Sequence, residues 1–296
     1  MDVLQWFDDN LVSMVDGVAF GLLLFTLAVG LSLVFGMMDI LNLAHGTLYL
    51  VGAYTAYSLS DGSIGGLALA LLVGGVVGGL GGVLLAGMTQ PLAGRGHLDQ
   101  AVLTLGVSFI VADILSSMYG AEVLPANPPA ALDGSVSVLG HVYPVYRLVF
   151  IGVAAALALT VWALFERSSL GALVRATVAD REMVRALGVD TRKVLLGVFA
   201  AGSALAALGG VFGAPILGPG PGVDESVLVL SLVVVVVGGL GSVSGALLGA
   251  LLIGQVQTLG VAVVPEYAPF LLFGTMLVVL AVRPAGLVSL TRRQAG

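Results

Sequence analysis

ERSSLGALVRATVADREMVRALGVDTRK, residues 166–193, is the one long charged stretch in a chain that is otherwise apolar. It holds six of the chain's 11 basic residues, namely Arg167, Arg175, Arg181, Arg185, Arg192 and Lys193. In a membrane protein, an excess of lysine and arginine marks the loops on the cytoplasmic side. The stretch therefore predicts a cytoplasmic loop between membrane spans, and it fixes the orientation of the rest of the chain.

The composition supports a membrane protein. Of 296 residues, 58% are hydrophobic and 9% are charged, and the mean hydropathy is +1.11. Soluble domains carry about 25% charged residues, so these values are typical of a chain with many spans. There is no cysteine, which excludes disulfides and thiolate metal sites. The net charge of −6 gives no sign of nucleic-acid binding, and the histidines lack a metal-ligand spacing.

The apolar stretches predict the number of crossings. A transmembrane helix needs about 20 mainly apolar residues, and nine stretches approach that length. They are residues 13–36, 41–60, 64–88, 101–120, 146–165, 194–216, 226–241, 243–264 and 268–283. The seventh is short and rich in valine, so a re-entrant segment is the alternative for it. We expect an all-α polytopic membrane protein of eight or nine transmembrane helices, in one domain of residues 1–296, with no evident internal repeat.

The loop charges predict the orientation. Basic residues expected in the cytoplasm are Arg95, those of the 166–193 loop, Arg283, Arg292 and Arg293. Acidic loop residues expected outside are Asp61, Glu122 and Asp133 of an extracellular loop 121–145, Asp224, Glu225 and Glu266. Nine crossings with the N-terminus outside and the C-terminus in the cytoplasm satisfy these placements, with Arg147 as the exception. We expect the plasma membrane of a bacterium or archaeon.

Glycine is frequent, at 43 residues, and recurs at helical spacing. Gly74, Gly78 and Gly82 lie on the third predicted span, and Gly241, Gly245 and Gly249 run into the eighth. Small residues four apart let helices approach closely in lipid. We expect close packing within this chain; a glycine face toward a second subunit is the alternative.

Residues 178–187, VADREMVRAL, read as a short helix inside the charged loop. Asp180 and Glu182 stand at its start and Arg185 in its last turn, which suits the helix dipole. Gly188 follows as a left-handed stop. The end signals therefore predict a helix that begins and ends inside the loop.

This helix has an apolar edge formed by Met183, Val184 and Leu187. Asp190 can cap the helix that follows. One reading is a solvated connector lying on the membrane surface. The other is a coupling helix that fits a groove on a cytoplasmic ATPase. The chain itself has no phosphate-binding loop, because its only lysine, Lys193, precedes Val194 rather than serine or threonine.

Four blocks of sequence resemble the branched-chain amino acid ABC transporter permeases of the LivH type. They are GLSLVFGMMDILNLAHGTLYLVGAYTAY (30–57), RATVADREMVRALGVDTRKVLLGVFAAGSALAALGGVFGAP (175–215), GGLGSVSGALLGALLIG (238–254) and RPAGL (283–287). The blocks follow in order and cover almost the whole chain. The family includes amide-type and urea-type relatives, so the resemblance is more specific for fold than for substrate.

The resemblance implies an importer of leucine, isoleucine and valine. It implies a second, LivM-like permease, two cytoplasmic ATPases that hold ATP and magnesium, and an external substrate-binding protein. It implies no enzyme activity and no cofactor in this chain. The implied coupling residues are Asp180, Arg181, Glu182, Met183, Arg185, Ala186, Leu187 and Gly188.

Polar residues inside the apolar stretches are the candidates for the translocation path. Asn42, His45, Tyr49 and Ala53 are three, four and four residues apart, so on a helix they share one face. They either line the path or hydrogen-bond neighbouring helices. Asp113 is the other candidate, with structural pairing or snorkelling to the outer surface as alternatives. Asp39 is either a helix cap or a contact.

Other classes of protein fit less well. An intramembrane protease would need a serine motif or paired aspartates, which this sequence does not provide. A secondary transporter or channel needs ion-coupling groups, and charged residues within the predicted spans are few. Uptake that persists without an ATPase would favour this alternative.

Overall fold

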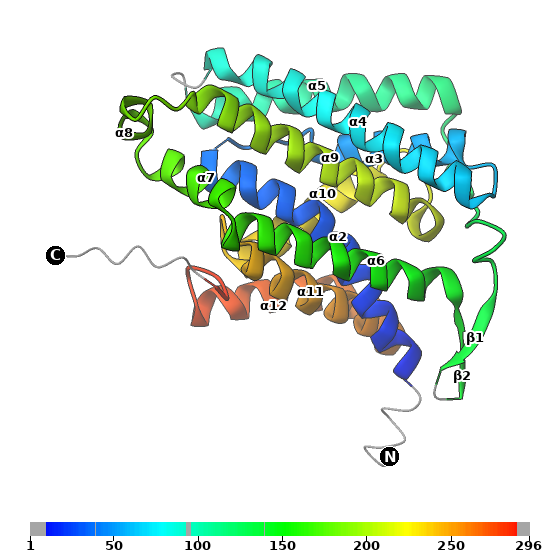
Figure 1. The fold of residues 1–296 in the computed structure, drawn as a ribbon. Helices are drawn as coiled ribbons and strands as arrows, with labels where there is room; N and C mark the ends of the chain where they lie inside the picture. Colours follow the sequence, from blue (N-terminus) through cyan, green and yellow to red (C-terminus); the bar gives the residue numbers. More distant parts are fainter. Residues whose placement is uncertain (1–9, 39, 93–95, 139, 289–296) are drawn as a thin grey trace.

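The helices lie side by side in one bundle, with α8 at one end and a β-hairpin at the other (Figure 1). The computed structural model describes residues 10–38, 40–92, 96–138 and 140–288. We name the two ends the α8 end and the hairpin end. Among the described residues, seven helices are long and apolar enough to cross a membrane. The chain is therefore a multi-pass membrane protein, as its composition predicts.

The elements follow each other along the chain with short connections. In order they are α2 (Leu11–Met38), α3 (His45–Leu59), α4 (Ile64–Thr89), η1 (Gln90–Leu92), α5 (His97–Tyr119), β1 (Ser135–Val138), β2 (His141–Pro144), α6 (Val145–Trp162), η2 (Ala163–Arg167), α7 (Ser169–Ala179), α8 (Arg181–Ala186), α9 (Thr191–Leu217), α10 (Val223–Gly238), α11 (Val243–Val263), η3 (Pro265–Tyr267) and α12 (Ala268–Val282).

Each of the nine predicted spans coincides with a helix, but α3 and α10 are short, with 15 and 16 residues. α12 also has 15 residues, but it continues η3 as one apolar helical stretch of 18 residues, Pro265–Val282. At 1.5 Å per residue α3 and α10 each cover about 22–24 Å, against a hydrocarbon core of about 30 Å. A complete crossing at either helix would need additional non-helical backbone. Such backbone occurs at membrane depth only where protein or water satisfies its polar groups.

The predicted second span, 41–60, is wrong at its start, because the helix begins at His45. Local hydrogen bonds compete with the helix before that residue. The Asn42 side-chain oxygen accepts from the N–H of Ala44 (3.2 Å). The Thr104 hydroxyl on α5 accepts from the N–H of Leu43 (3.1 Å) and lies 3.2 Å from the carbonyl oxygen of Leu41.

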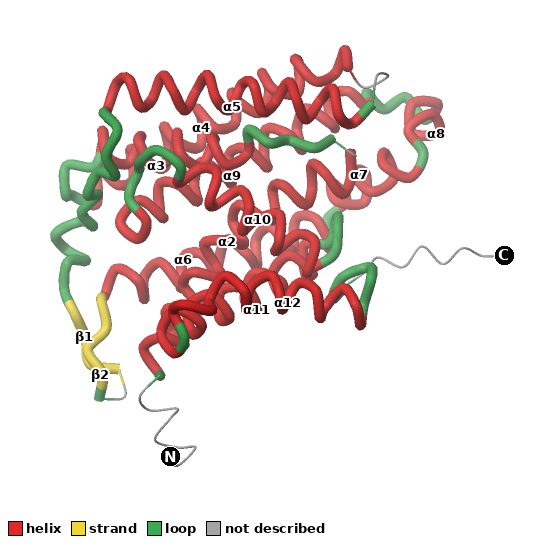
Figure 2. The backbone as a smooth tube through the Cα atoms, turned by 180° about the vertical axis from the view of Figure 1, so that it is seen from behind, coloured by secondary structure: helices red, strands yellow, loops and turns green. Residues whose placement is uncertain are grey.

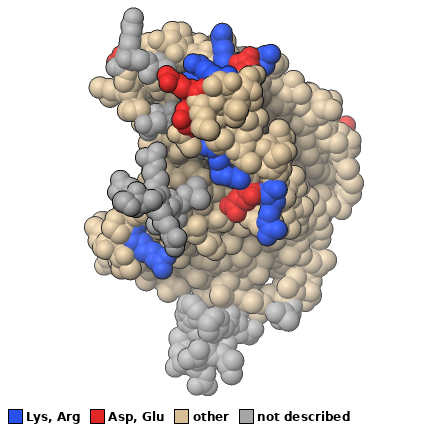
Figure 3. All heavy atoms as spheres, turned by 60° about the vertical axis from the view of Figure 1, so that its left-hand side comes forward, with Lys and Arg blue, Asp and Glu red and all other residues tan. Residues whose placement is uncertain are grey.

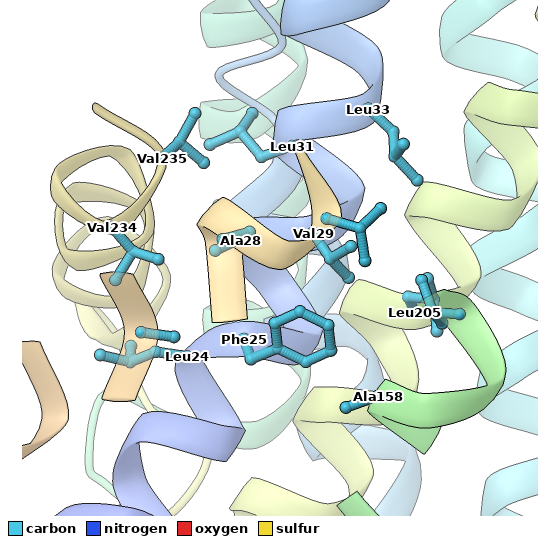
Figure 4. Close-up of a cluster of buried hydrophobic side chains, with 14 of the residues drawn as sticks. Leu24, Phe25, Ala28, Val29, Leu31, Leu33, Ala158, Leu205, Val234 and Val235 are labelled. Carbon is cyan, nitrogen blue, oxygen red and sulfur yellow. The ribbon is translucent and has the colours of Figure 1, made fainter. Parts of the chain in front are cut away.

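α2 is the centre of the bundle, with every residue from 21 to 34 buried. Figure 4 shows Leu24, Phe25 and Ala28 of α2 surrounded by side chains from other helices, among them Val234 of α10 and Leu205 of α9. Burial of this many apolar side chains among neighbouring helices holds α2 in place on all sides.

The order of helices occurs twice, which the sequence did not reveal. A long helix, a short one and then two further helices form α2–α3–α4–α5, and again α9–α10–α11–α12 (Figure 2). α2 and α9 are antiparallel, because Gly30 lies against Gly202 and Thr26 against Gly209. The two halves therefore enter the membrane from opposite sides. In such inverted repeats, substrate sites lie where short, discontinuous helices meet.

Glycines bring these helices together, as their spacing predicts. A Cβ atom at Gly78 or Gly82 would overlap residues of α9, including the carbonyl oxygens of Ser203 and Phe199. Gly249 lies against α10, and Gly254 against the backbone of Gly21 on α2. These contacts are within the chain, so they support the first of the two alternatives for the glycine faces.

The expected loop 121–145 ends in a two-stranded antiparallel hairpin, which the all-helical expectation missed. Val136 pairs with Tyr143 across the strands. The hairpin also explains Arg147, the exception to the charge pattern. Arg147 forms an ion pair with Asp16 of α2, and the Tyr143 hydroxyl donates to the same carboxylate (2.7 Å). The positive charge is therefore paired within the chain.

Candidate functional site

The starts of the two short helices lie against each other. A Cβ atom at Gly46, in the first turn of α3, would overlap the carbonyl oxygen of Asp224 in the first turn of α10. We call this contact the junction. The ring Nε2 of His45, beside Gly46, donates to the carbonyl oxygen of Leu27 (3.0 Å). Leu27 is 16 residues from the first residue of α2 and 11 from the last, so the junction lies deep within the bundle.

A chain of polar side chains crosses the junction. The Thr47 hydroxyl of α3 donates to the Asp224 carboxylate of α10 (3.3 Å). The same hydroxyl is 2.5 Å from the Ser108 hydroxyl of α5. All three side chains are buried, and Asp224 is only 4% exposed. Three helices from both halves of the chain therefore meet through polar groups.

The face of α5 that packs on the bundle is mainly polar, which is unusual for a membrane helix. Its buried residues are Gln100, Ala101, Thr104 and Ser108, three of them polar. Further along, the Tyr119 hydroxyl is 2.7 Å from the Ser58 hydroxyl of α3. We call this row of contacts between α3 and α5 the polar seam. Aromatic rings add to these contacts, because the Tyr119 ring stacks on that of Tyr54, with 4.5 Å between centroids, and meets the edge of Tyr57.

The junction favours negative charge. The first turn of a helix presents unpaired N–H groups and a partial positive charge, and two such turns, those of α3 and α10, meet here. Among the described residues, no lysine or arginine forms an ion pair with Asp224: the described ion pairs are Arg147–Asp16 and Lys193–Asp190. Two neighbouring buried atoms, Asn42 Nδ2 and His45 Nδ1, have no hydrogen-bond partner in this part of the chain.

The predicted path residues lie in two separate parts of the structure. Asn42, His45 and Tyr49 are fully buried, but Asn42 precedes the helix and so does not share its face. Tyr49 packs against α9, where Gly210 and Gly213 leave it room. Asp113 lies elsewhere, on the exposed side of α5. Asp39 lies outside the described residues.

Asp224 is the residue that the sequence reasoning misplaced. It was expected in an outer loop together with Glu225, because acidic charge between two apolar stretches is typical of a loop. The segment GPGPG, residues 218–222, precedes both residues. That segment is non-helical, and α10 begins directly after it, which places Asp224 inside the bundle. The available signal was an acidic residue in the first turn of an apolar helix, a position that the helix dipole stabilises.

At the α8 end, the charged loop folds as its end signals predict. The Asp180 carboxylate caps α8 by accepting from the N–H of Met183 (2.8 Å). Gly188 has a φ of 84°, a left-handed conformation that glycine adopts at low cost. Asp190 caps α9 by accepting from the N–H groups of Arg192 and Lys193. The helix is shorter than the predicted 178–187, since α7 continues to Ala179.

α8 presents two apolar side chains outward. Met183 is 63% exposed and Leu187 is 74% exposed, whereas Val184 is 5% exposed and faces the chain. The three side chains therefore do not form the single apolar edge that the sequence predicted. Side chains of lysine and arginine gather over this end of the molecule (Figure 3).

The base of α8 is tied to α9. Arg185 Nε donates to the Thr191 hydroxyl (2.9 Å), and Arg181 Nε approaches the same oxygen (3.4 Å). Burial, and then the neighbouring Arg185, lower the pKa of Arg181, but a guanidinium remains charged at neutral pH. Arg185 is thus part of the anchor of α8, and Met183 and Leu187 form its free surface.

A second link joins the loop to α11. The Glu166 carboxylate accepts from the N–H of Ser244 in the first turn of α11 (3.2 Å). Arg175 of α7 donates to the carbonyl oxygen of Phe165. These residues border a cavity of about 240 Å³ beside Ser242. Glu166 of η2 therefore connects the charged loop to the start of α11, and Arg175 connects α7 to η2.

Comparison with known proteins finds similarity to one family of membrane permeases. A family model for a branched-chain amino acid transport system / permease component matches residues 13–280. The high-affinity branched-chain amino acid transport system permease protein BraD of Pseudomonas aeruginosa is 28% identical over 292 residues, covering 94% of this chain and 95% of the relative. The corresponding protein LivH of Escherichia coli is 26% identical over 302 residues, with the same coverage.

The permease protein LivM of Escherichia coli is also similar, at 29% identity, covering 90% of this chain and 68% of the relative. No solved structure matches the chain significantly. The matched model spans all the long helices, the junction and α8. The chain therefore belongs to the family of branched-chain amino acid transport system permease components.

Proposed function

We propose that the chain is one of two permease subunits of an ATP-driven importer for leucine, isoleucine and valine. Its partners are a second, LivM-like permease, two cytoplasmic ABC ATPases and an external substrate-binding protein. The relatives named LivH and LivM, both similar to this chain, support the pairing. The chain binds no cofactor of its own in this proposal, and ATP and magnesium bind to the ATPases.

The α8 end faces the cytoplasm in this proposal, and the hairpin end faces outside. The loop 166–193 carries the excess of basic residues that favours the cytoplasmic side. α2 begins at the hairpin end and α12 ends at the α8 end (Figure 1), which fits an N-terminus outside and a C-terminus inside. The external binding protein would deliver substrate at the hairpin end.

The observation that carries the proposal is the construction of α8. A helix of six residues is too short to be stable alone, yet this one is capped by Asp180 and anchored through Val184 and Arg185. It leaves Met183 and Leu187 exposed at the tip of the loop. We assign these two exposed apolar side chains, on a capped and anchored helix, as the contact with the ATPase. An ATPase that closes on ATP could therefore push on α8.

The experiment is the double variant Met183→Asp plus Leu187→Asp in the complete transporter. The expected result is normal insertion of the permease, loss of ATPase binding, and leucine uptake reduced by about tenfold or more, since each buried apolar anchor contributes about 1.5–3 kcal/mol. The matched control is Arg192→Gln, an exposed position in the first turn of α9 that is not among the expected coupling residues. Full uptake by the double variant would overturn the assignment of α8.

Substrate identity is tested separately. The binding protein is co-purified with the permease, and its ligands are displaced with leucine, valine, an aliphatic amide and urea. Displacement by leucine and valine alone is expected. Displacement by the amide or urea instead would assign the chain to another substrate class within the same family.

A further inference from the structure

Asp224 is buried at the junction without a positive partner among the described residues. Membership of the family does not by itself explain this buried carboxylate. We propose that Asp224 receives the α-ammonium group of the amino acid as the substrate passes between α3, α5 and α10. The inference rests on the proposed function, because it takes the substrate to be a zwitterionic α-amino acid. It assigns one substrate contact to one residue of this chain.

The first argument is the state of the carboxylate. Ionisable side chains inside a membrane protein are costly, and they usually face a partner or an aqueous path. Asp224 is 4% exposed and has one described hydrogen bond, from Thr47 at 3.3 Å. The first turns of α3 and α10 stabilise it in part. A carboxylate held in this way retains free acceptor capacity for a cationic group.

The second argument is the chemistry around it. A carboxylate that existed only for packing would have its hydrogen bonds filled, as buried polar groups generally do. Just before and at the start of α3, Asn42 Nδ2 and His45 Nδ1 are buried and unpartnered among the described residues. Unfilled polar capacity on these two residues is expected where a polar ligand stays for part of the cycle.

The third argument is access. The polar seam runs from Thr104 past Ser108 to Tyr119 along α5. Ser108 covers Thr47, and Thr47 covers Asp224. Separation of α5 from α3 would break these hydrogen bonds and the stacking of Tyr119 on Tyr54. The polar seam therefore supplies a route by which a hydrophilic backbone reaches the carboxylate.

The chain is naturally free of cysteine, so a single introduced thiol can report on this position. Asp224→Cys is placed in the complete transporter and treated with 2-aminoethyl methanethiosulfonate, a small cation, during ATP-driven turnover. We expect modification at least tenfold faster than at Ser231→Cys. Ser231 is the matched control, because it lies on the same helix and is fully buried, and among the described residues its hydroxyl bonds only to the carbonyl oxygen of Val227.

Uptake gives the second readout. Asp224→Asn is expected to lower the maximal rate of leucine uptake by about tenfold or more, since it removes a charge-assisted hydrogen bond. Asp224→Glu should restore part of the rate, and Ser231→Ala should leave it unchanged. Thr47→Val, which removes the hydrogen bond and keeps the charge, should cost less than Asp224→Asn.

The outcomes separate the possibilities. An Asp224→Cys thiol as unreactive as Ser231→Cys would overturn the inference. Uptake by Asp224→Asn within twofold of the wild type would also overturn it, as would equal losses in Asp224→Asn and Thr47→Val, which would indicate a packing role. Absence of leucine uptake by the wild-type transporter would overturn the proposed function itself.

Discussion

The Thr47 hydroxyl and the Asp224 carboxylate lie 3.3 Å apart, although 177 residues separate them in the chain. The contact joins the first turns of two short helices, one from each half of the molecule. Neither helix can cross a bilayer alone, so their starts meet inside the bundle. The contact therefore marks the place where the two halves, entering from opposite sides, are joined.

The close approach of α3 and α9 predicts a sensitive position at Gly210. A Cβ atom there would overlap the carbonyl oxygen of Tyr49 on α3. Gly210→Ala should force the helices apart and cost about 1–3 kcal/mol, measured as a lower midpoint of thermal unfolding in detergent. Gly197→Ala is the control on the same helix, where a Cβ atom meets nothing within 4 Å. Equal midpoints for the two variants would contradict the packing described here.

The ion pair at the hairpin end predicts a loss of stability when one partner is removed. Arg147→Met leaves the Asp16 carboxylate with Tyr143 alone. Because the pair is only partly buried, we expect a cost of about 1–3 kcal/mol. The double variant Arg147→Met plus Asp16→Leu should recover part of it. Chemical unfolding of the single and double variants measures the coupling, and additive losses would exclude an interaction between the two residues.

The cap of α8 predicts a local effect. Asp180→Ala removes the acceptor for the N–H of Met183, and such a loss costs about 1 kcal/mol. Hydrogen exchange of the α8 amides should become about fivefold faster, while exchange in α2 is unchanged. Asp180→Asn retains an acceptor oxygen and should behave as the wild type. Unchanged α8 exchange in Asp180→Ala would show that the cap contributes nothing.

The link between the charged loop and α11 makes a similar prediction. Glu166→Leu removes the acceptor for the N–H of Ser244, while Glu166→Gln keeps one. The hydrogen bond contributes a net stabilisation of about 1 kcal/mol. Its loss should therefore make hydrogen exchange of the Ser244 amide about fivefold faster in Glu166→Leu, whereas Glu166→Gln should exchange at the wild-type rate. The ratio of leucine imported to ATP hydrolysed should also fall in Glu166→Leu. Identical exchange in both variants would show that this bond does not persist in solution.

The sequence predicted those features that depend on neighbouring residues. The stop at Gly188 and the cap of α9 by Asp190 are local chemistry, and the structure has both. Asp180, predicted in the first turn of a helix that begins at Val178, is instead the N-cap of α8. Glycine spacing predicted close packing of α4 within the chain, since the requirement for close approach is encoded in residue size. That the partner is α9 came from the structure.

Other features depend on distant residues and were not predictable in this way. Thr104, more than 60 residues away, hydrogen-bonds the backbone before α3, so the start of that helix could not be read from residues 41–45. Val184 turns inward because of packing against the rest of the chain, which periodicity over six residues cannot show. Asp224 was misplaced because charge normally marks a loop, and here two helix starts stabilise it.

The central claim is that ATP hydrolysis on separate subunits drives transport through this permease. The most direct measurement is the uptake of labelled leucine into vesicles that contain the permease pair with the binding protein, with and without the ATPases. Accumulation against a gradient only when the ATPases and ATP are present is the predicted result. Sustained accumulation in vesicles that lack the ATPases would contradict the account.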